Sequence, residues 1–266
     1  MSKPTQVPLG AERHVNLSGN TFSFSMPENF SPDMPAEPLI EHFNIDQYPE
    51  SSNGLLIQRW WDIKEPGFFG KGLGTIMMSI NAHQVPQNTR KRVHATPYNI
   101  ENRLDLILLI DESIHARYAD DKNRDAEFSY SLPSIAALAG SKLETEYRDR
   151  VYGKQKWTSY SIAGPHSQLI VNNVLPINNS TFLEVSFTYS PNSGVAPRHF
   201  LDFAYQVTHP IEESFLVEYK NGNPIQTVVE QTWINRSTDS VLRENQANII
   251  LPLFGPKIHK QYLLEN

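Results

Sequence analysis

Strict alternation of apolar and polar side chains predicts the first strands of the chain. Between residues 21 and 26, large apolar side chains alternate with serines, so one face of this segment is apolar and the other is polar. Pro27 ends the pattern because proline cannot donate to a strand ladder. The preceding segment, 14–17, is joined to it through a Ser-Gly-Asn sequence that suits the positive φ of a tight turn. The pattern therefore predicts a β-hairpin.

Further segments have the β-branched and apolar content of strands. They are residues 39–45, 55–62, 75–82, 142–151, 156–162, 168–175 and 181–190. The first three predict a meander, because proline-, serine- and glycine-rich turns join them. The strands on either side of Gly153 predict a long hairpin. Together they indicate a largely antiparallel sheet.

Two amphipathic helices are predicted to lie on this sheet. Thr96 as the N-cap and Pro97 at the first helical position begin the first helix, whose apolar residues recur every three or four positions to about Tyr118. Pro197 begins the second helix, in which apolar side chains share one face until His209 and Pro210 mark its end. The predicted fold class is therefore α+β.

The end of the chain is predicted to add a hairpin and a tail. Segments 214–220 and 224–231 lie on either side of Asn221 and Gly222, a strong two-residue hairpin signal. The tail, 232–266, carries an apolar cluster that would be costly to leave in water, so it is expected to pack on the domain. The predicted organisation is a polar leader over 1–13, one α+β domain over 14–231, and this docked tail.

Composition excludes several functional classes. The 266 residues carry a net charge of −6, so the broad positive field of nucleic-acid-binding proteins is missing. The chain has no cysteine, which excludes disulfides, thiolate nucleophiles and iron–sulfur sites. No apolar run reaches the roughly 20 residues of a membrane span, and the N-terminus lacks a signal-peptide core. We expect a cytoplasmic protein, or a periplasmic one if an export signal has been removed.

Local motifs for phosphate, metal or serine chemistry are not found in the sequence. The glycine-rich segment 67–74 leads into a predicted strand instead of a helix, so it is interpreted as a hairpin tip in which Phe68 and Phe69 can anchor a partner. Asp121 and Asp125 have calcium-loop spacing, but the turn glycine and the closing glutamate are missing. No His-Glu-x-x-His or Gly-x-Ser-x-Gly motif occurs. No metal or cofactor is therefore predicted.

Both ends of the predicted domain resemble Mog1/PsbP-like proteins. The run Phe-Ser-Phe-Ser-Met-Pro-Glu-Asn-Phe at 22–30 is similar to the opening strand of that group, and residues 200–207 followed by Glu213, Ser214 and Phe215 are similar to its closing helix and Ser-Phe ending. The chain is longer than one such domain, and it continues beyond Phe215. The resemblance implies a Mog1/PsbP-like sheet with two main helices.

Bacterial proteins that combine a polar leader, this opening strand and no catalytic motif are similar to immunity proteins that neutralise type VI secretion effectors, including lipase effectors. This resemblance implies a non-enzymatic protein that occludes a cognate toxin. The surface expected to do so combines aromatic and acidic residues, with one of two consecutive tryptophans facing outward. Its candidate residues are Trp60, Trp61, Phe68, Phe69, Asp120, Asp121 and Asp125.

Two other functions remain open at the level of sequence. One is a chaperone or adaptor that binds an apolar segment of a secreted effector. The other is an enzyme whose site is assembled from distant residues such as His83, His166 and Asp202.

Overall fold

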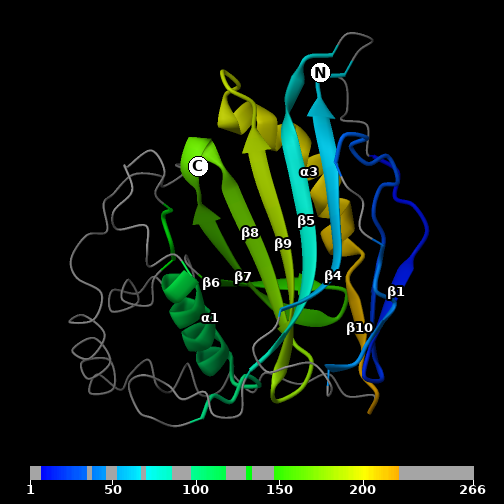
Figure 1. Ribbon diagram of the computed structural model, residues 1–266, viewed down its shortest axis with the longest axis vertical. Coiled ribbons are helices and arrows are strands. Elements are labelled where there is room, and N and C mark those ends of the chain that lie inside the picture. The colour runs from blue at the N-terminus through cyan, green and yellow to red at the C-terminus, as the bar shows by residue number, and fades with distance from the viewer. Residues whose placement is uncertain are drawn as a thin grey trace, which may run out of the picture.

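The computed structural model is an α+β fold with large antiparallel sheets (Figure 1). It describes residues 7–34, 38–45, 53–66, 70–85, 97–117, 130–133 and 147–221. The predicted second strand of the C-terminal hairpin, 224–231, and the tail, 232–266, lie outside the described residues. The α+β class predicted from the sequence is confirmed.

The smaller sheet contains four strands in the order β10-β2-β1-β3. Their bounds are β1 Arg13–Leu17, β2 Asn20–Phe24, β3 His42–Phe43 and β10 Leu216–Glu218. The predicted first hairpin is confirmed: Ser18 and Gly19 form its turn with φ values of 53° and 97°. The meander predicted from segment 39–45 is wrong, because β3 spans two residues and pairs in parallel with β1 instead of joining the next strands.

The larger sheet contains six strands, and each neighbouring pair is antiparallel. The order is β4-β5-β9-β8-β7-β6. The bounds are β4 Asn53–Lys64, β5 Gly72–Gln84, β6 Tyr147–Tyr152, β7 Gln155–Ala163, β8 Leu169–Pro176 and β9 Thr181–Pro191. The predicted hairpin about Gly153 is confirmed by the pairing of β6 with β7, and Gly153 adopts a φ of 58° in the turn.

Helix α1, Arg103–Arg117, begins later than the sequence predicts. The side-chain Oδ1 of Asn102 accepts hydrogen bonds from the backbone N–H groups of Leu104 and Asp105, at 2.9 and 3.4 Å. Asn102 is therefore the N-cap instead of Thr96. Pro97 precedes the helix, separated from it by a turn in which Asn102 N–H donates to Asn99 O.

Helix α3, Pro197–Glu213, begins at the predicted proline but continues past the predicted end. Pro210 lies inside the helix, where it removes one backbone donor. The last turn persists because Ile211 is fully buried in the core and Ser214 Oγ donates to Ile211 O at 2.6 Å. Burial of an apolar side chain here outweighs the loss of one helical hydrogen bond.

The main hydrophobic core lies between the two sheets and α3. Phe22, Tyr152, Trp157 and Phe215 meet there, and Phe215 lies 5.4 to 5.6 Å from the other three rings, centroid to centroid. A second cluster joins α1 to side chains of β6, β7, β8 and β9. No helix in the described part of the chain combines the length and the apolarity that crossing a bilayer requires.

Candidate functional site

The two faces of the larger sheet differ in chemistry because its strands alternate. On β5, Ile76, Met78 and Ile80 are fully buried in the main core, whereas the residues that alternate with them from Thr75 to Asn81 are half-buried and, except for Met77, polar. Strand β9 repeats this pattern, with Val185 and Phe187 in the core. Since successive side chains of a strand point to opposite faces, the polar residues of both strands lie on the face away from this core.

A groove of about 290 Å³ lies on this polar face. Strands β5, β7, β8 and β9 and the last residue of α1 supply its lining. The lining residues are Met77, Ser79, Asn81, His83, Arg117, Tyr160, Ile162, Ile170, Asn172, Glu184, Ser186 and Thr188. Most of them carry hydroxyl, amide or ionisable groups, unlike the apolar lining of a typical small-molecule pocket.

His83 and Glu184 lie next to each other at one end of the groove. His83 Nε2 is 3.4 Å from Glu184 Oε1, and both side chains are close to nine-tenths buried. The Tyr160 hydroxyl donates to Glu184 Oε2 at 3.2 Å, and the imidazole of His83 stacks on Phe182 with ring centroids 4.8 Å apart. Burial opposes ionisation of Glu184, but His83, the nearby Arg117 guanidinium and Tyr160 outweigh it, so the pKa of this carboxyl lies below its usual range.

Two uncharged polar side chains on the groove floor have no such partners. Asn172 is 4% exposed and Ser186 is 8% exposed, and they lie directly opposite each other on β8 and β9. Neither makes a side-chain hydrogen bond within the described ranges. Their polar atoms reach solvent in the groove, so both side chains can donate to and accept from an incoming ligand.

The chain matches no family model and no curated protein. The chemistry of the groove therefore has to be argued from its own residues. Within the described residues, no group of three or more histidine, aspartate or glutamate side chains is placed to hold a metal ion.

The two tryptophans of the predicted surface point to opposite faces of β4. Trp61 is 2% exposed in the main core, and its Nε1–H donates to Pro27 O at 3.3 Å. Trp60 is half-buried and faces the groove side, because its Cα partner on β5 is Met77, a groove residue. Of the predicted pair, only Trp60 lies beside the groove.

The rest of the predicted surface is not described. Phe68 and Phe69, and the acidic residues Asp120, Asp121 and Asp125, all lie outside the described residues. Their role as partner-binding residues stays a prediction.

The dispersed catalytic set suggested by the sequence is not assembled in the groove. His83 lines it, but His166 lies in the 3-10 turn Pro165–Ser167 with a φ of 53°, and Asp202 is exposed on α3. The structure instead brings His83 next to Glu184.

Sequence reasoning missed Glu184, Tyr160, Asn172 and Ser186. The signal that would have found them is the polar half of the alternation: Ser-x-Asn-x-His on β5 and Glu-x-Ser-x-Thr on β9. Strands covered on both faces usually carry apolar residues on both, so polar residues at every second position indicate a face that is at least partly open.

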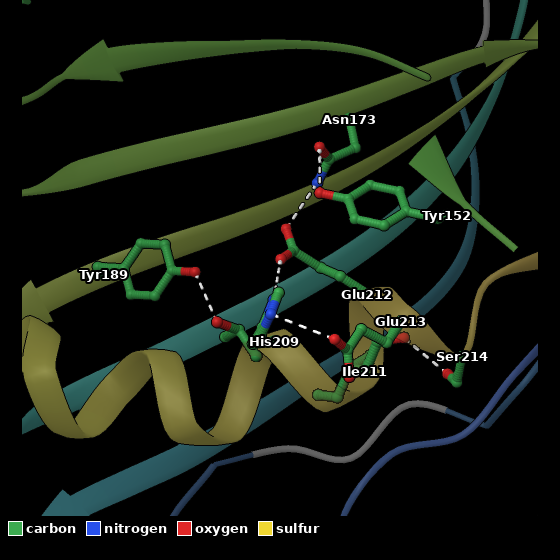
Figure 2. A network of polar contacts seen from close by, with 9 residues as sticks. Tyr152, Asn173, Tyr189, His209, Ile211, Glu212, Glu213 and Ser214 are labelled. Carbon is green, nitrogen blue, oxygen red and sulfur yellow. Dashed lines mark hydrogen bonds and ion pairs between the residues drawn. The ribbon is translucent and has the colours of Figure 1, made fainter. Parts of the chain in front are cut away.

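A second polar cluster lies on the opposite face, between α3 and the sheet (Figure 2). Glu212 Oε1 accepts a hydrogen bond from Asn173 Nδ2 at 3.0 Å, and the Tyr152 hydroxyl donates to Asn173 Oδ1 at 3.3 Å. His209 Nδ1 lies 3.7 Å from Glu212 Oε2. Burial raises the pKa of Glu212 despite the opposing effects of these neighbours. These contacts hold the C-terminal end of α3 against β8.

Proposed function

We propose that this chain is a non-enzymatic binding protein that neutralises a bacterial type VI secretion effector by occluding it. The observation that carries the proposal is the pair Asn172 and Ser186, whose polar groups face the groove without a hydrogen-bond partner among the described residues. The polar atoms of both side chains reach solvent in the groove, so a partner's polar side chain can replace water there with direct hydrogen bonds. The Mog1/PsbP-like resemblance of the two ends of the domain supports the same assignment.

The proposed mechanism is docking of the groove face onto the effector. Side chains held on a six-stranded sheet are rigid, so little conformational entropy is lost when a partner binds. Trp60, beside the groove, adds aromatic contact area of the kind enriched at interfaces. A partner loop held in this groove would be withdrawn from the effector's own substrate.

The test is complex formation with the product of the gene that adjoins this one. We expect the two purified proteins to co-elute in size-exclusion chromatography, and the effector's hydrolase activity to fall in proportion to the chain added. Asn172→Leu should weaken the complex, whereas Ser161→Ala, at an exposed position on β7, should leave it unchanged. No complex with any adjacent toxin would contradict the proposal. A complex that leaves the effector fully active would favour the chaperone or adaptor function.

A specific observation favours a second candidate function, catalysis at the His83–Glu184 pair. A carboxylate that orients a histidine is the common support for a general base. Turnover of chromogenic esters or glycosides that is lost in His83→Gln, with partner binding retained, would establish this function. Turnover that is equal in His83→Gln and the wild type would exclude this pair as its source.

A further inference from the structure

Two parallel rows of side chains run across the strands on the polar face, and their members from β5 to β7 form the groove floor. The first row is polar, and its members are Cα partners from one strand to the next: Gln58, Ser79, Ser186, Asn172 and Tyr160. The second row is mostly apolar, and its members are likewise Cα partners on neighbouring strands: Trp60, Met77, Thr188, Ile170 and Ile162. The groove therefore presents a polar stripe beside an apolar one.

The separation of the two rows matches the repeat of an extended peptide. On every strand the rows are two residues apart, which corresponds to about 6.6–6.8 Å. Side chains i and i+2 of an extended segment lie on one face at the same spacing. A segment running along the strand direction can thus place one side chain over Ser186 and Asn172 and the next same-face side chain over Thr188 and Ile170, with Met77 next to Thr188 on β5.

The polar row carries no formal charge of its own at neutral pH. Among the described residues that line the groove, Glu184 is the only carboxylate; it faces His83 and Tyr160 and lies near Arg117. A charged incoming side chain would lose its hydration and find no free counter-charge on the polar row. An amide or hydroxyl side chain would find both donors and acceptors in Asn172 and Ser186.

Building on the partner-binding function above, we propose that the groove receives an extended peptide segment of the partner. The segment carries an uncharged amide or hydroxyl side chain over Asn172 and Ser186. Two positions away, it carries an apolar side chain over Ile170 and Thr188, in reach of Met77. Its recognition motif is Asn, Gln, Ser or Thr, then any residue, then an aliphatic or aromatic residue, in either chain direction.

The test is panning of a phage-displayed random peptide library on the immobilised full chain. We expect the enriched peptides to share the polar-x-apolar motif. A synthetic copy of the most enriched peptide should bind the wild type in a fluorescence-anisotropy titration. Asn172→Leu, which keeps the branched shape but replaces the amide with two methyl groups, should weaken its binding by about tenfold. Ser161→Ala serves as the matched control and should bind as the wild type does.

A milder substitution tests the same inference if Asn172→Leu fails to fold. Ser186→Ala removes a single hydroxyl from the floor and should weaken the same peptide by about threefold. Absence of any enriched peptide, enrichment of peptides with a charge at the polar position, or unchanged affinity in both variants would overturn the inference. So would binding of neutral oligosaccharides, cellobiose and maltotriose in the same titration, with no peptide enriched.

The two proposals fail in different ways. If a complex with the effector forms but the library yields no motif, the groove assignment is wrong and the partner-binding function stands. If the library yields the motif but no adjacent toxin binds, the groove recognises peptides and the immunity function is wrong.

Discussion

Two buried glutamates have pKa values displaced in opposite directions. Burial disfavours the charged form of both, but Glu184 has His83, Arg117 and Tyr160 around it and stays ionised, whereas the neighbours of Glu212 do not overcome its burial. The pKa of Glu184 is therefore lowered and that of Glu212 is raised. The two glutamates, on opposite faces of the sheet, therefore contribute to stability in opposite pH ranges.

Glu212→Gln should reduce the pH dependence of folding. Because the pKa of Glu212 is raised above its ordinary value of 4.5, the folded state binds this proton more tightly than the unfolded chain does. The resulting stability is fully present below the ordinary pKa and is lost as the pH rises through the raised one. We expect the free energy of unfolding of the wild type, minus that of the variant, to fall as the pH rises from 4 to 8 in urea titrations.

Glu213→Gln is the matched control, since this neighbouring carboxylate is 61% exposed. Its difference from the wild type should be small, because an exposed carboxylate contributes little to stability. A Glu212→Gln difference that does not change with pH would show that the carboxyl ionises equally easily in both states.

The sequence predicts which face of a strand a side chain lies on, but it does not predict which side chains of different strands meet. The opposite orientations of Trp60 and Trp61 follow from the period of a strand, and the structure confirms that one of them is in the core. Which glutamate meets which histidine depends on the register between β5 and β9, where Asn81 lies opposite Glu184 and His83 opposite Phe182. No local pattern fixes a register between strands so far apart in the chain.

At the scale of elements, the apolar periodicity correctly predicts both helices, but it predicts the wrong start for the first and the wrong end for the second. The first helix begins directly after Asn102, because the side chain of this asparagine accepts hydrogen bonds from two backbone N–H groups of the first turn. The second continues through Pro210 because tertiary burial of Ile211 compensates for a missing donor. Helix ends depend on such local competition, which periodicity alone does not report.

Asn102→Ala should destabilise the protein by about 1 kcal/mol, because it removes the N-cap of α1. Asn102→Asp should retain most of the stability, since aspartate caps as well as asparagine does. Thermal unfolding followed by circular dichroism provides the measurement. Equal losses in the two variants would mean that the amide group, and not the capping oxygen, is what the site requires.

At the scale of the whole molecule, one aromatic cluster joins both sheets. Phe22 comes from the smaller sheet, Tyr152 and Trp157 come from the larger sheet, and Phe215 follows α3. Their contacts make the two sheets parts of one core. Sequence alternation predicted that Phe22 is buried, but it contained nothing to indicate that the strands would divide into two sheets.

Phe215→Ala should lower the free energy of unfolding by about 3–5 kcal/mol, because it leaves a cavity where three other rings meet. Tryptophan fluorescence and far-ultraviolet circular dichroism should report the same denaturant midpoint, since the two sheets unfold together. Val151→Ala, at a side chain that is 69% exposed, should change stability by less than about 0.5 kcal/mol. Separate midpoints in the wild type would mean that the sheets are independent units.

The pairing of β2 with β10 also determines when folding can finish during translation. Lys220 N–H donates to the Asn20 side chain 200 positions earlier, and Leu216 pairs with Ser23 in the same ladder. The first hairpin leaves the ribosome long before β10 has been synthesised. Its Phe22 side chain therefore cannot pack in the core until Trp157 and then Phe215 have been added to the chain. Throughout that interval the nascent chain exposes an apolar strand edge, which makes it a substrate for holding chaperones.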